Sequence, residues 1–234
     1  MRKLAVTLII TGLFLSMITT SQASFDSIKL ANFPKDSHLY RALTNIQSLT
    51  HLNKIVLLPK NSFNQQEAAS IINRIGTLPE SVLTNLSNEN IILKLFTGNL
   101  TDNPTARHLT GIVPRGYPDG RTWDDVPGIG GSKVVLVKIG SSAKGQGHSS
   151  INLELHEMAH SIDRYLYNNI SQEPEFKRIW EEERGNLFPG NAYFIMHSEE
   201  YFAETFAMYY FSEETMLQLR SKAPRTYQLI KNLN

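Results

Sequence analysis

Two histidines and a glutamate, His156, Glu157 and His160, stand in the stretch LELHEMAHSID. Residues four apart on a helix share one face, so both imidazoles can reach a single ion. Catalytic zinc takes three protein ligands and keeps a fourth position for water, whose proton Glu157 can accept. An amphipathic helix whose two histidines make ordinary hydrogen bonds could have the same sequence. The presence of a third ligand elsewhere in the chain would favour a metal site over this alternative.

The third ligand does not follow the HExxHxxGxxH pattern, because positions 163 and 166 are Asp163 and Leu166. Two later segments offer glutamates, WEEERGN and SEEYFAETFAMYY. The run of charges at 181–183 is typical of a solvated helix face. Glu200 and Glu204 instead lie four apart on an apolar, aromatic helix, where buried charges need a partner or a metal. A ligand together with a carboxylate that orients a ligand histidine would explain both.

The elements around these residues indicate an α+β fold, with a small mixed sheet and helices first and an all-helical half after it. Apolar periodicity predicts strands at 54–59, 91–97 and 133–140, with a further strand around 108–113, and helices at 38–49, 61–79, 79–86, 151–169, 173–187, 198–212 and 213–233, the last broken near Pro224. The expected helix caps are Asn61 or Ser62, Ser149 or Ser150, and Ser198.

The first 23 residues have the pattern of a secretory signal peptide. Arg2 and Lys3 precede an apolar run, and Ser21 and Ala23 fit a small-x-small cleavage site. The alternative is an uncleaved membrane anchor. We expect residues 24–234 to form one exported domain without a further membrane segment, and without disulfides, because the sequence has no cysteine. The net charge of +1, with scattered basic residues, does not favour a nucleic-acid or membrane-surface binder.

The segments HEMAHSID and EEYFAETFAMYY together resemble the catalytic domain of anthrax lethal factor and, more closely, the small secreted Pro-Pro endopeptidases of Gram-positive bacteria. The similarity runs from about Trp123 to the C-terminus and includes APRTYQLIKNL. The resemblance implies a zincin-like domain that binds one Zn²⁺, with His156, His160 and Glu200 as ligands, Glu157 as general base and Glu204 as a second carboxylate behind the ligands.

The same resemblance implies roles around the substrate. Tyr193 would help to stabilise the oxyanion, and Trp123 would pack on a substrate proline, although each could also be an ordinary packed aromatic. Arg121 and Glu199 would form a salt bridge at the border of the site. From the residues alone, Asp163 is expected to be structural, His148 to be an exposed loop histidine, and the glycine-rich stretches GIGGSK and SSAKGQGH to be mobile flaps.

The expected function is that of a secreted zinc endopeptidase, acting as a monomer on a bond between two prolines in proline-rich extracellular or surface proteins. Its substrate would add as a strand to a sheet edge, for which the strand at 133–140 is the candidate. One alternative is a lethal-factor-like toxin of different specificity, against which the short chain argues. The other is an exported binding protein that lacks catalysis, against which the intact set of site residues argues.

Overall fold

The computed structural model describes residues 26–115 and 120–233, so the predicted signal peptide (1–23) lies outside the described residues. The strands are β1 (Ser27–Lys29), β2 (Val56–Pro59), β3 (Ile92–Phe96), β4 (Gly128–Ile129) and β5 (Val134–Lys138). The α-helices are α2 (His38–Arg41), α3 (Leu49–Ile55), α4 (Gln65–Ile75), α5 (Glu80–Asn88), α6 (Leu153–Tyr165), α7 (Pro174–Leu187), α8 (Ala192–Met196), α9 (Ser198–Phe211), α10 (Glu213–Lys222) and α11 (Pro224–Lys231). This confirms the predicted α+β fold with a helical C-terminal half.

The five strands form one mixed sheet in the order β1-β2-β3-β5-β4. The central pairs β2–β3 and β3–β5 are parallel, and the outer strands β1 and β4 are antiparallel to their neighbours. Strand β5, the predicted docking edge for a peptide, therefore lies inside the sheet, and that prediction is wrong. The edge on this side is the two-residue strand β4.

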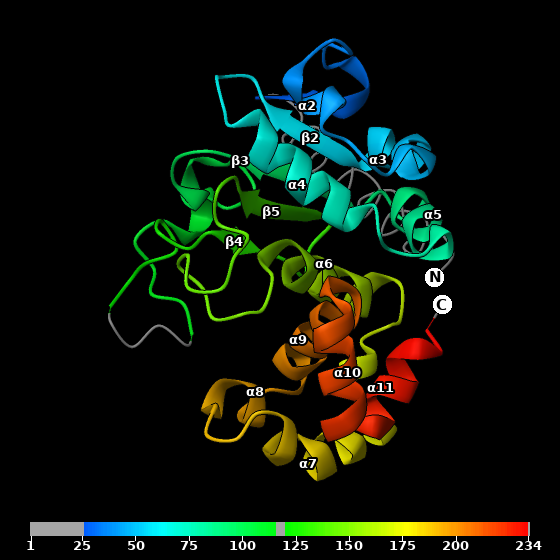
Figure 1. The fold of residues 1–234 in the computed structure, drawn as a ribbon. Helices are drawn as coiled ribbons and strands as arrows, with labels where there is room; N and C mark the ends of the chain where they lie inside the picture. The colour runs from blue at the N-terminus through cyan, green and yellow to red at the C-terminus, as the bar shows by residue number, and fades with distance from the viewer. Residues whose placement is uncertain (1–25, 116–119, 234) are drawn as a thin grey trace, which may run out of the picture.

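Successive side chains along the strands point to opposite faces of the sheet and belong to two separate hydrophobic clusters. Leu93, Leu95, Val135 and Val137 point into the large cluster shared with the helices. Phe96, Val134 and Leu136 point to the opposite face, where the loop that carries Trp123 covers them. Figure 1 shows α6 lying between the sheet and the C-terminal helices, so this helix receives contacts from both halves of the chain.

Helix α6 begins where the side chain of Asn152 accepts a hydrogen bond from the Leu155 amide, at 3.1 Å. The predicted caps Ser149 and Ser150 lie before this point. The helix buries Leu155, Met158 and Ile162 in the large cluster. Helix α9 is buried on nearly every side, including Glu200 and Glu204, and its contact with α6 is the most extensive between any two elements of the described chain.

Several predictions of individual elements were wrong, because contacts with residues outside the predicted segment determine its secondary structure. Residues 107–109 form a 3-10 helix instead of a strand, and the following Ile112 and Val113 are about half exposed. The predicted helix 38–49 divides into α2 and a later start of α3. Helix α4 is capped by Asn64, which accepts from the amides of Gln66 and Glu67, and not by an earlier residue. The predicted loop after α7 contains the short helix α8.

Strand β4 and the turn after it lie directly on α6. The Gly131 amide donates to Ser161 Oγ at 3.0 Å, Ser161 Oγ donates to the Ser132 carbonyl, and Arg164 donates to the Gly131 carbonyl. A side chain at Gly130 would place its Cβ 1.9 Å from the backbone oxygen of Glu157. The stretch GIGGSK, predicted to be a mobile flap, is therefore fastened to the helix and requires glycine at position 130.

We expect Gly130→Ala to destabilise the protein by about 1–3 kcal/mol or more, because the added methyl group forces β4 away from α6. Gly185→Ala is the matched control. Gly185 is exposed on α7 and a methyl group added there would meet no neighbouring atom, so alanine should be neutral or stabilise by about 0.5–1 kcal/mol. Urea unfolding of both variants measures the difference. Equal stability of Gly130→Ala and the natural protein would show that the seam between β4 and α6 can open without cost.

Candidate metal centre and substrate cleft

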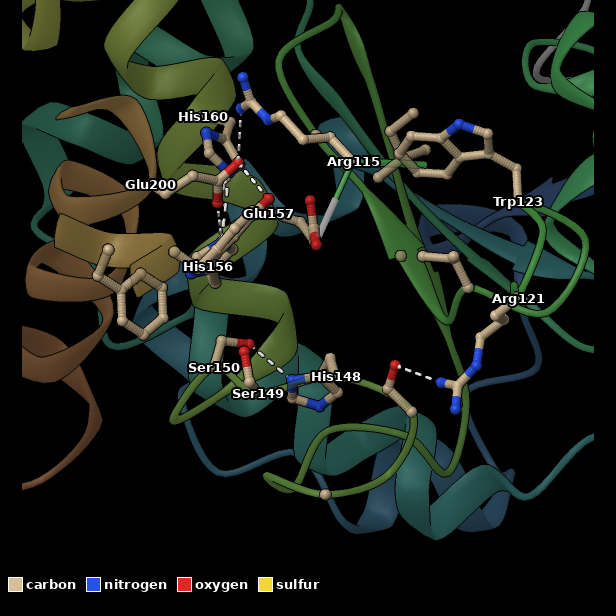
Figure 2. A pocket seen from close by; sticks show the side chains of 18 residues that line it. Arg115, Arg121, Trp123, His148, Ser149, Ser150, His156, Glu157, His160 and Glu200 are labelled. Atoms are coloured by element: carbon tan, nitrogen blue, oxygen red, sulfur yellow. Dashed lines mark hydrogen bonds and ion pairs between the residues drawn. The ribbon is translucent and has the colours of Figure 1, made fainter. Parts of the chain in front are cut away.

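A cleft of about 650 Å³ lies at the β4 edge of the sheet. Figure 2 shows His156, Glu157, His160 and Glu200 on one wall, Trp123 and Arg121 on the opposite wall, and His148 with Ser149 and Ser150 below them. The cleft therefore brings together residues from α6, α9 and two long loops.

Three ligand atoms meet on the α6 side of the cleft. His156 Nε2 lies 3.3 Å from His160 Nε2 and 3.2 Å from Glu200 Oε2, and His160 Nε2 lies 3.4 Å from the same oxygen. Atoms at about 2.0–2.1 Å from a tetrahedral ion are separated by about 3.3 Å, so this group of atoms has a spacing that could hold a metal ion. No other group of three metal-binding side chains occurs within the residues that the structure describes.

The two oxygens of Glu200 have different partners. Oε2 faces both histidines, whereas Oε1 accepts a hydrogen bond from Tyr193 Oη at 2.7 Å and lies 3.6 Å from Arg115 Nη2. The carboxylate is thus held from outside and presents one oxygen to the histidines. An ion held by these three atoms would keep a coordination position on the side of the cleft for water or substrate, which is the arrangement of catalytic zinc sites.

Glu204 sits behind His156, one helical turn after Glu200. Its Oε2 accepts from His156 Nδ1 at 3.1 Å, and its Oε1 accepts from the Ile151 amide at 2.8 Å. The first bond keeps the proton on Nδ1 and leaves Nε2 for an ion. The second bond fixes the carboxylate to the chain just before α6. Glu204 therefore sets both the tautomer and the orientation of His156.

In the metal-free site, the neighbouring carboxylates favour the protonated form of His156. Burial lowers the pKa of His156, but its hydrogen bonds to Glu200 and Glu204 outweigh this and raise the pKa to about 10. Burial alone would raise the pKa of Glu200, yet the hydrogen bonds and charges of the two histidines move that pKa well below its usual range. At neutral pH the metal-free centre is thus an imidazolium between two carboxylates.

Glu157 lies next to the ligands and faces the cleft. Burial raises the pKa of its carboxyl group, while the two neighbouring histidines and a hydrogen bond from the Gly130 amide partly oppose that rise. A raised pKa makes the carboxylate a stronger proton acceptor and moves it towards the neutral pH range, in which one group can take up a proton and later return it. The contact with Gly130 also links this group to the β4 edge.

Tyr193 comes from α8, which the Asn191 side chain caps by accepting from the Tyr193 amide. Burial and the negative charge of Glu200 raise the pKa of Tyr193 well above its ordinary value, so its hydroxyl stays protonated and acts as a donor. The sequence predicted this residue near the site, and the structure places its hydroxyl on the ligand carboxylate.

The predicted salt bridge between Arg121 and Glu199 is not the one that forms. Arg115 Nη2 pairs with Glu199 Oε1 at 2.8 Å, whereas Arg121 Nη1 donates to the Gly147 carbonyl at 3.1 Å. The exchange has a simple geometric reason, because Arg115 lies beside the beginning of α9 and Arg121 lies across the cleft (Figure 2). Sequence reasoning missed Arg115, which stands in a loop without any motif.

His148 differs from the exposed loop residue that was predicted. It is half-buried, its Nε2 donates to the Ser141 carbonyl at 2.8 Å, and its Nδ1 lies 2.6 Å from Ser150 Oγ. Both bonds close the loop between β5 and α6, which forms the floor of the cleft in Figure 2. Together with the bond from Arg121 to Gly147, they fasten a segment that was predicted to be a flap.

Trp123 is partly buried and packs on the smaller hydrophobic cluster, and its amide donates to the Ile112 carbonyl at 2.9 Å. It lines the cleft opposite the ligands. Asp163, by contrast, lies in the last turn of α6 and accepts from the amide and the hydroxyl of Ser171, at 3.0 and 2.6 Å, which agrees with its expected structural role.

We expect Glu204→Gln to weaken zinc affinity by about 10–100-fold, because the amide no longer holds the His156 proton on Nδ1 as a carboxylate does. The matched control is Glu199→Gln, earlier on the same helix, whose carboxylate pairs with Arg115. Competition with a chromogenic chelator measures both affinities. An equal loss in the two variants would mean that helix stability, and not the contact with His156, controls metal binding.

Zinc binding to the metal-free protein should release about one proton per ion at pH 7, because His156, with its pKa of about 10, must give up the proton on Nε2. The release should decrease as the pH rises through 10. Calorimetric titrations in buffers of different ionisation enthalpy count the protons. A binding enthalpy that does not depend on the buffer would contradict this protonation state.

Comparison with known proteins agrees with this geometry. Residues 43–233 match the family described as "Anthrax toxin lethal factor, N- and C-terminal domain". A protein of Clostridioides difficile named Pro-Pro endopeptidase is 41% identical over 206 residues, covering 87% of this chain and 92% of its own length. A protein of Paenibacillus alvei with the same name is 39% identical over 196 residues, 83% of this chain and 90% of its own.

A solved structure described as the Pro-Pro endopeptidase from Paenibacillus alvei superposes with a TM-score of 0.75 at 39% sequence identity, covering 79% of this chain and all of that one. Identity at this level over most of both chains extends the similarity from the metal centre to the fold. The chain therefore belongs to the Pro-Pro endopeptidase family, among the relatives of anthrax toxin lethal factor.

Proposed function

We propose that the protein is a secreted, zinc-dependent endopeptidase that hydrolyses a bond between two prolines in proline-rich extracellular or surface proteins. The observation that carries the proposal is the group of three candidate ligand atoms separated by 3.2–3.4 Å, which lies next to Glu157 and lines the cleft. The relatives named Pro-Pro endopeptidase support the choice of bond.

One Zn²⁺ per chain is the proposed cofactor, held by His156, His160 and Glu200. The donor set of two imidazoles and one carboxylate suits zinc, and the three atoms already have the spacing it requires. Zinc at this place would supply the Lewis acidity that strengthens water as a nucleophile and polarises a peptide carbonyl. Glu204 contributes by holding His156 in the tautomer that can bind the ion.

The remaining steps belong to side chains of the cleft. Glu157 accepts a proton from the attacking water and then gives it to the nitrogen of the leaving proline, which becomes a secondary amine. The Tyr193 hydroxyl, kept protonated by burial, donates to the oxygen on which negative charge develops. Its bond to Glu200 places it close enough to turn towards substrate.

Substrate recognition would combine backbone pairing and ring contacts. Strand β4 is the free edge beside the ligands and can take an extended peptide as a further strand. Because proline lacks an N–H group, a Pro-Pro segment offers few donors to such an edge, and the face of Trp123 supplies apolar contact instead. Arg115, which pairs with Glu199, lines the cleft near the ligands, and Arg121 lines the opposite wall; these side chains would contact the residues that flank the two prolines.

We further propose that the protein acts as a monomer outside the cell, after removal of residues 1–23, with no nucleic-acid or membrane partner. Across the described ranges, no helix has the length and apolar character needed to cross a bilayer. A lethal-factor-like toxin of other specificity and a non-catalytic binding protein are the competing functions. The cleavage assay below separates all three.

We expect the zinc-loaded protein to cleave peptides with Pro-Pro at the centre, between the two prolines, and to spare matched peptides with a single proline there. Glu157→Gln should reduce kcat by about 10²–10⁴-fold while zinc remains stoichiometric, because only the proton acceptor is lost. Tyr193→Phe should reduce kcat by about 10²-fold. Mass spectrometry of a library with varied flanks identifies the cut.

Metal analysis of each variant is the control for this assay. Cleavage at bonds without proline would favour the toxin-like peptidase, and stoichiometric zinc without any cleavage would favour the binding protein. Undiminished cleavage by Glu157→Gln would remove the proposed mechanism.

A further inference from the structure

Asp124 stands next to Trp123 and joins three separate segments of the cleft wall. Its Oδ1 accepts from the hydroxyl of Thr101, in the 3-10 helix Leu100–Asp102. Its Oδ2 accepts from Thr122 Oγ1 and from the Gly111 amide, both at 2.8 Å. A carboxylate that takes three donors from three segments behaves as a crosslink in a stretch that contains little regular secondary structure.

The backbone around Asp124 strengthens the same connection. The Leu100 amide donates to the Asp124 carbonyl at 3.1 Å, and the Trp123 amide donates to the Ile112 carbonyl at 2.9 Å. Gly111 has a φ of +71°, so the turn that brings its amide to the carboxylate needs a conformation that other residues rarely adopt. The turn at 111–112 is thereby bonded to the Trp123 amide and to the Asp124 side chain.

The position of Trp123 relative to the ligands depends on these bonds. The small cluster beneath it, which includes Leu100, Ala106 and Val126, fixes the depth of the indole. Apolar packing alone does not fix the lateral position of the indole ring on the sheet. The hydrogen bonds of the adjacent Asp124 fix that position, because they hold the backbone that carries the ring. The opposite wall, with His156 and Glu200, is set independently by α6 and α9.

We propose that Asp124 is a positioning residue for substrate recognition, which holds Trp123 at the distance from the metal centre that a proline ring requires. The inference rests on the proposed contact between Trp123 and substrate. Asp124 does not touch substrate or reacting atoms. Its hydrogen bonds, that from Thr101 first, also lower its pKa to about 2, so the carboxylate is charged at neutral pH.

The test compares Asp124→Ala with Asp125→Ala, its exposed neighbour in the same loop. Loss of the three bonds should raise KM for a Pro-Pro peptide by about 10-fold and leave kcat within about 3-fold, because a displaced wall weakens binding more than it alters the groups that react. Asp125→Ala should keep the natural KM. Thr101→Val should reproduce part of the effect, and Thr101→Ser should restore the natural value.

A fluorescence experiment reads the position of Trp123 without any activity. The chain has two tryptophans, and Trp180 is nearly buried with its Nε1 bonded to the Phe194 carbonyl, so Trp180→Phe isolates the signal of Trp123. In that background, Asp124→Ala should increase acrylamide quenching of Trp123 by at least about 2-fold, because the loop loosens. Asp125→Ala should leave quenching unchanged.

A double-variant cycle then separates positioning from general stability. In a Trp123→Ala background, Asp124→Ala should raise KM no further, because the residue that it positions is gone. An unchanged KM and unchanged quenching in Asp124→Ala would overturn the proposal, as would a full additional rise of KM when Asp124→Ala is added to Trp123→Ala.

If Asp124→Ala does not fold, Asp124→Asn provides the milder test, since the Thr101 hydroxyl can turn to accept from the new amide. If no Pro-Pro peptide is cleaved by the natural protein, the proposed function fails, while the quenching result still decides the positioning role.

Discussion

His156 of α6 is held between two carboxylates of α9, with Glu204 on Nδ1 and Glu200 facing Nε2. Buried carboxylates are costly unless each has a partner, so the two helices can pack closely only in a register that places both oxygens on the imidazole. The same register brings His160 to Glu200 and places Tyr193, just before α9, on the outer oxygen of that carboxylate. The geometry of the metal centre is therefore a consequence of one helix contact.

The contact between β4 and α6 fixes the position of the sheet edge relative to the metal-site residues of α6. Gly130 lets the sheet edge touch the backbone at Glu157, and Ser161 and Arg164 fasten the turn that follows. Because the edge strand and Glu157, the proposed proton acceptor, share a contact, a peptide paired with β4 would lie at a fixed height over the proposed metal ligands. Stiff contact between the recognition edge and the reacting group is what precise placement of a scissile bond requires.

Local spacing pointed to the candidate ligands: two histidines one turn apart, and two glutamates one turn apart on a helix too apolar to leave them unpaired. The choice of Glu200 over Glu204 as the ligand came from the resemblance to the Pro-Pro endopeptidases. The main strands and helices followed from periodicity, which is also a local pattern. The arginine partner of Glu199 could not be found, because the loop around Arg115 has no pattern that states where it folds. Strand β4 was missed because two residues carry no alternation, and Glu183, read as part of a solvated run, is buried where it caps α11 through the Arg225 and Thr226 amides.

The two hydrophobic clusters lie on opposite faces of one sheet, and the work of the cleft is divided between them. The larger cluster supports α6 and α9 with the reacting groups, whereas the smaller one supports the Trp123 loop. Substitutions beneath Trp123 can therefore reshape the recognition wall without disturbing the histidines across the sheet. The shape of the recognition wall and the geometry of the candidate metal centre can therefore change independently of each other.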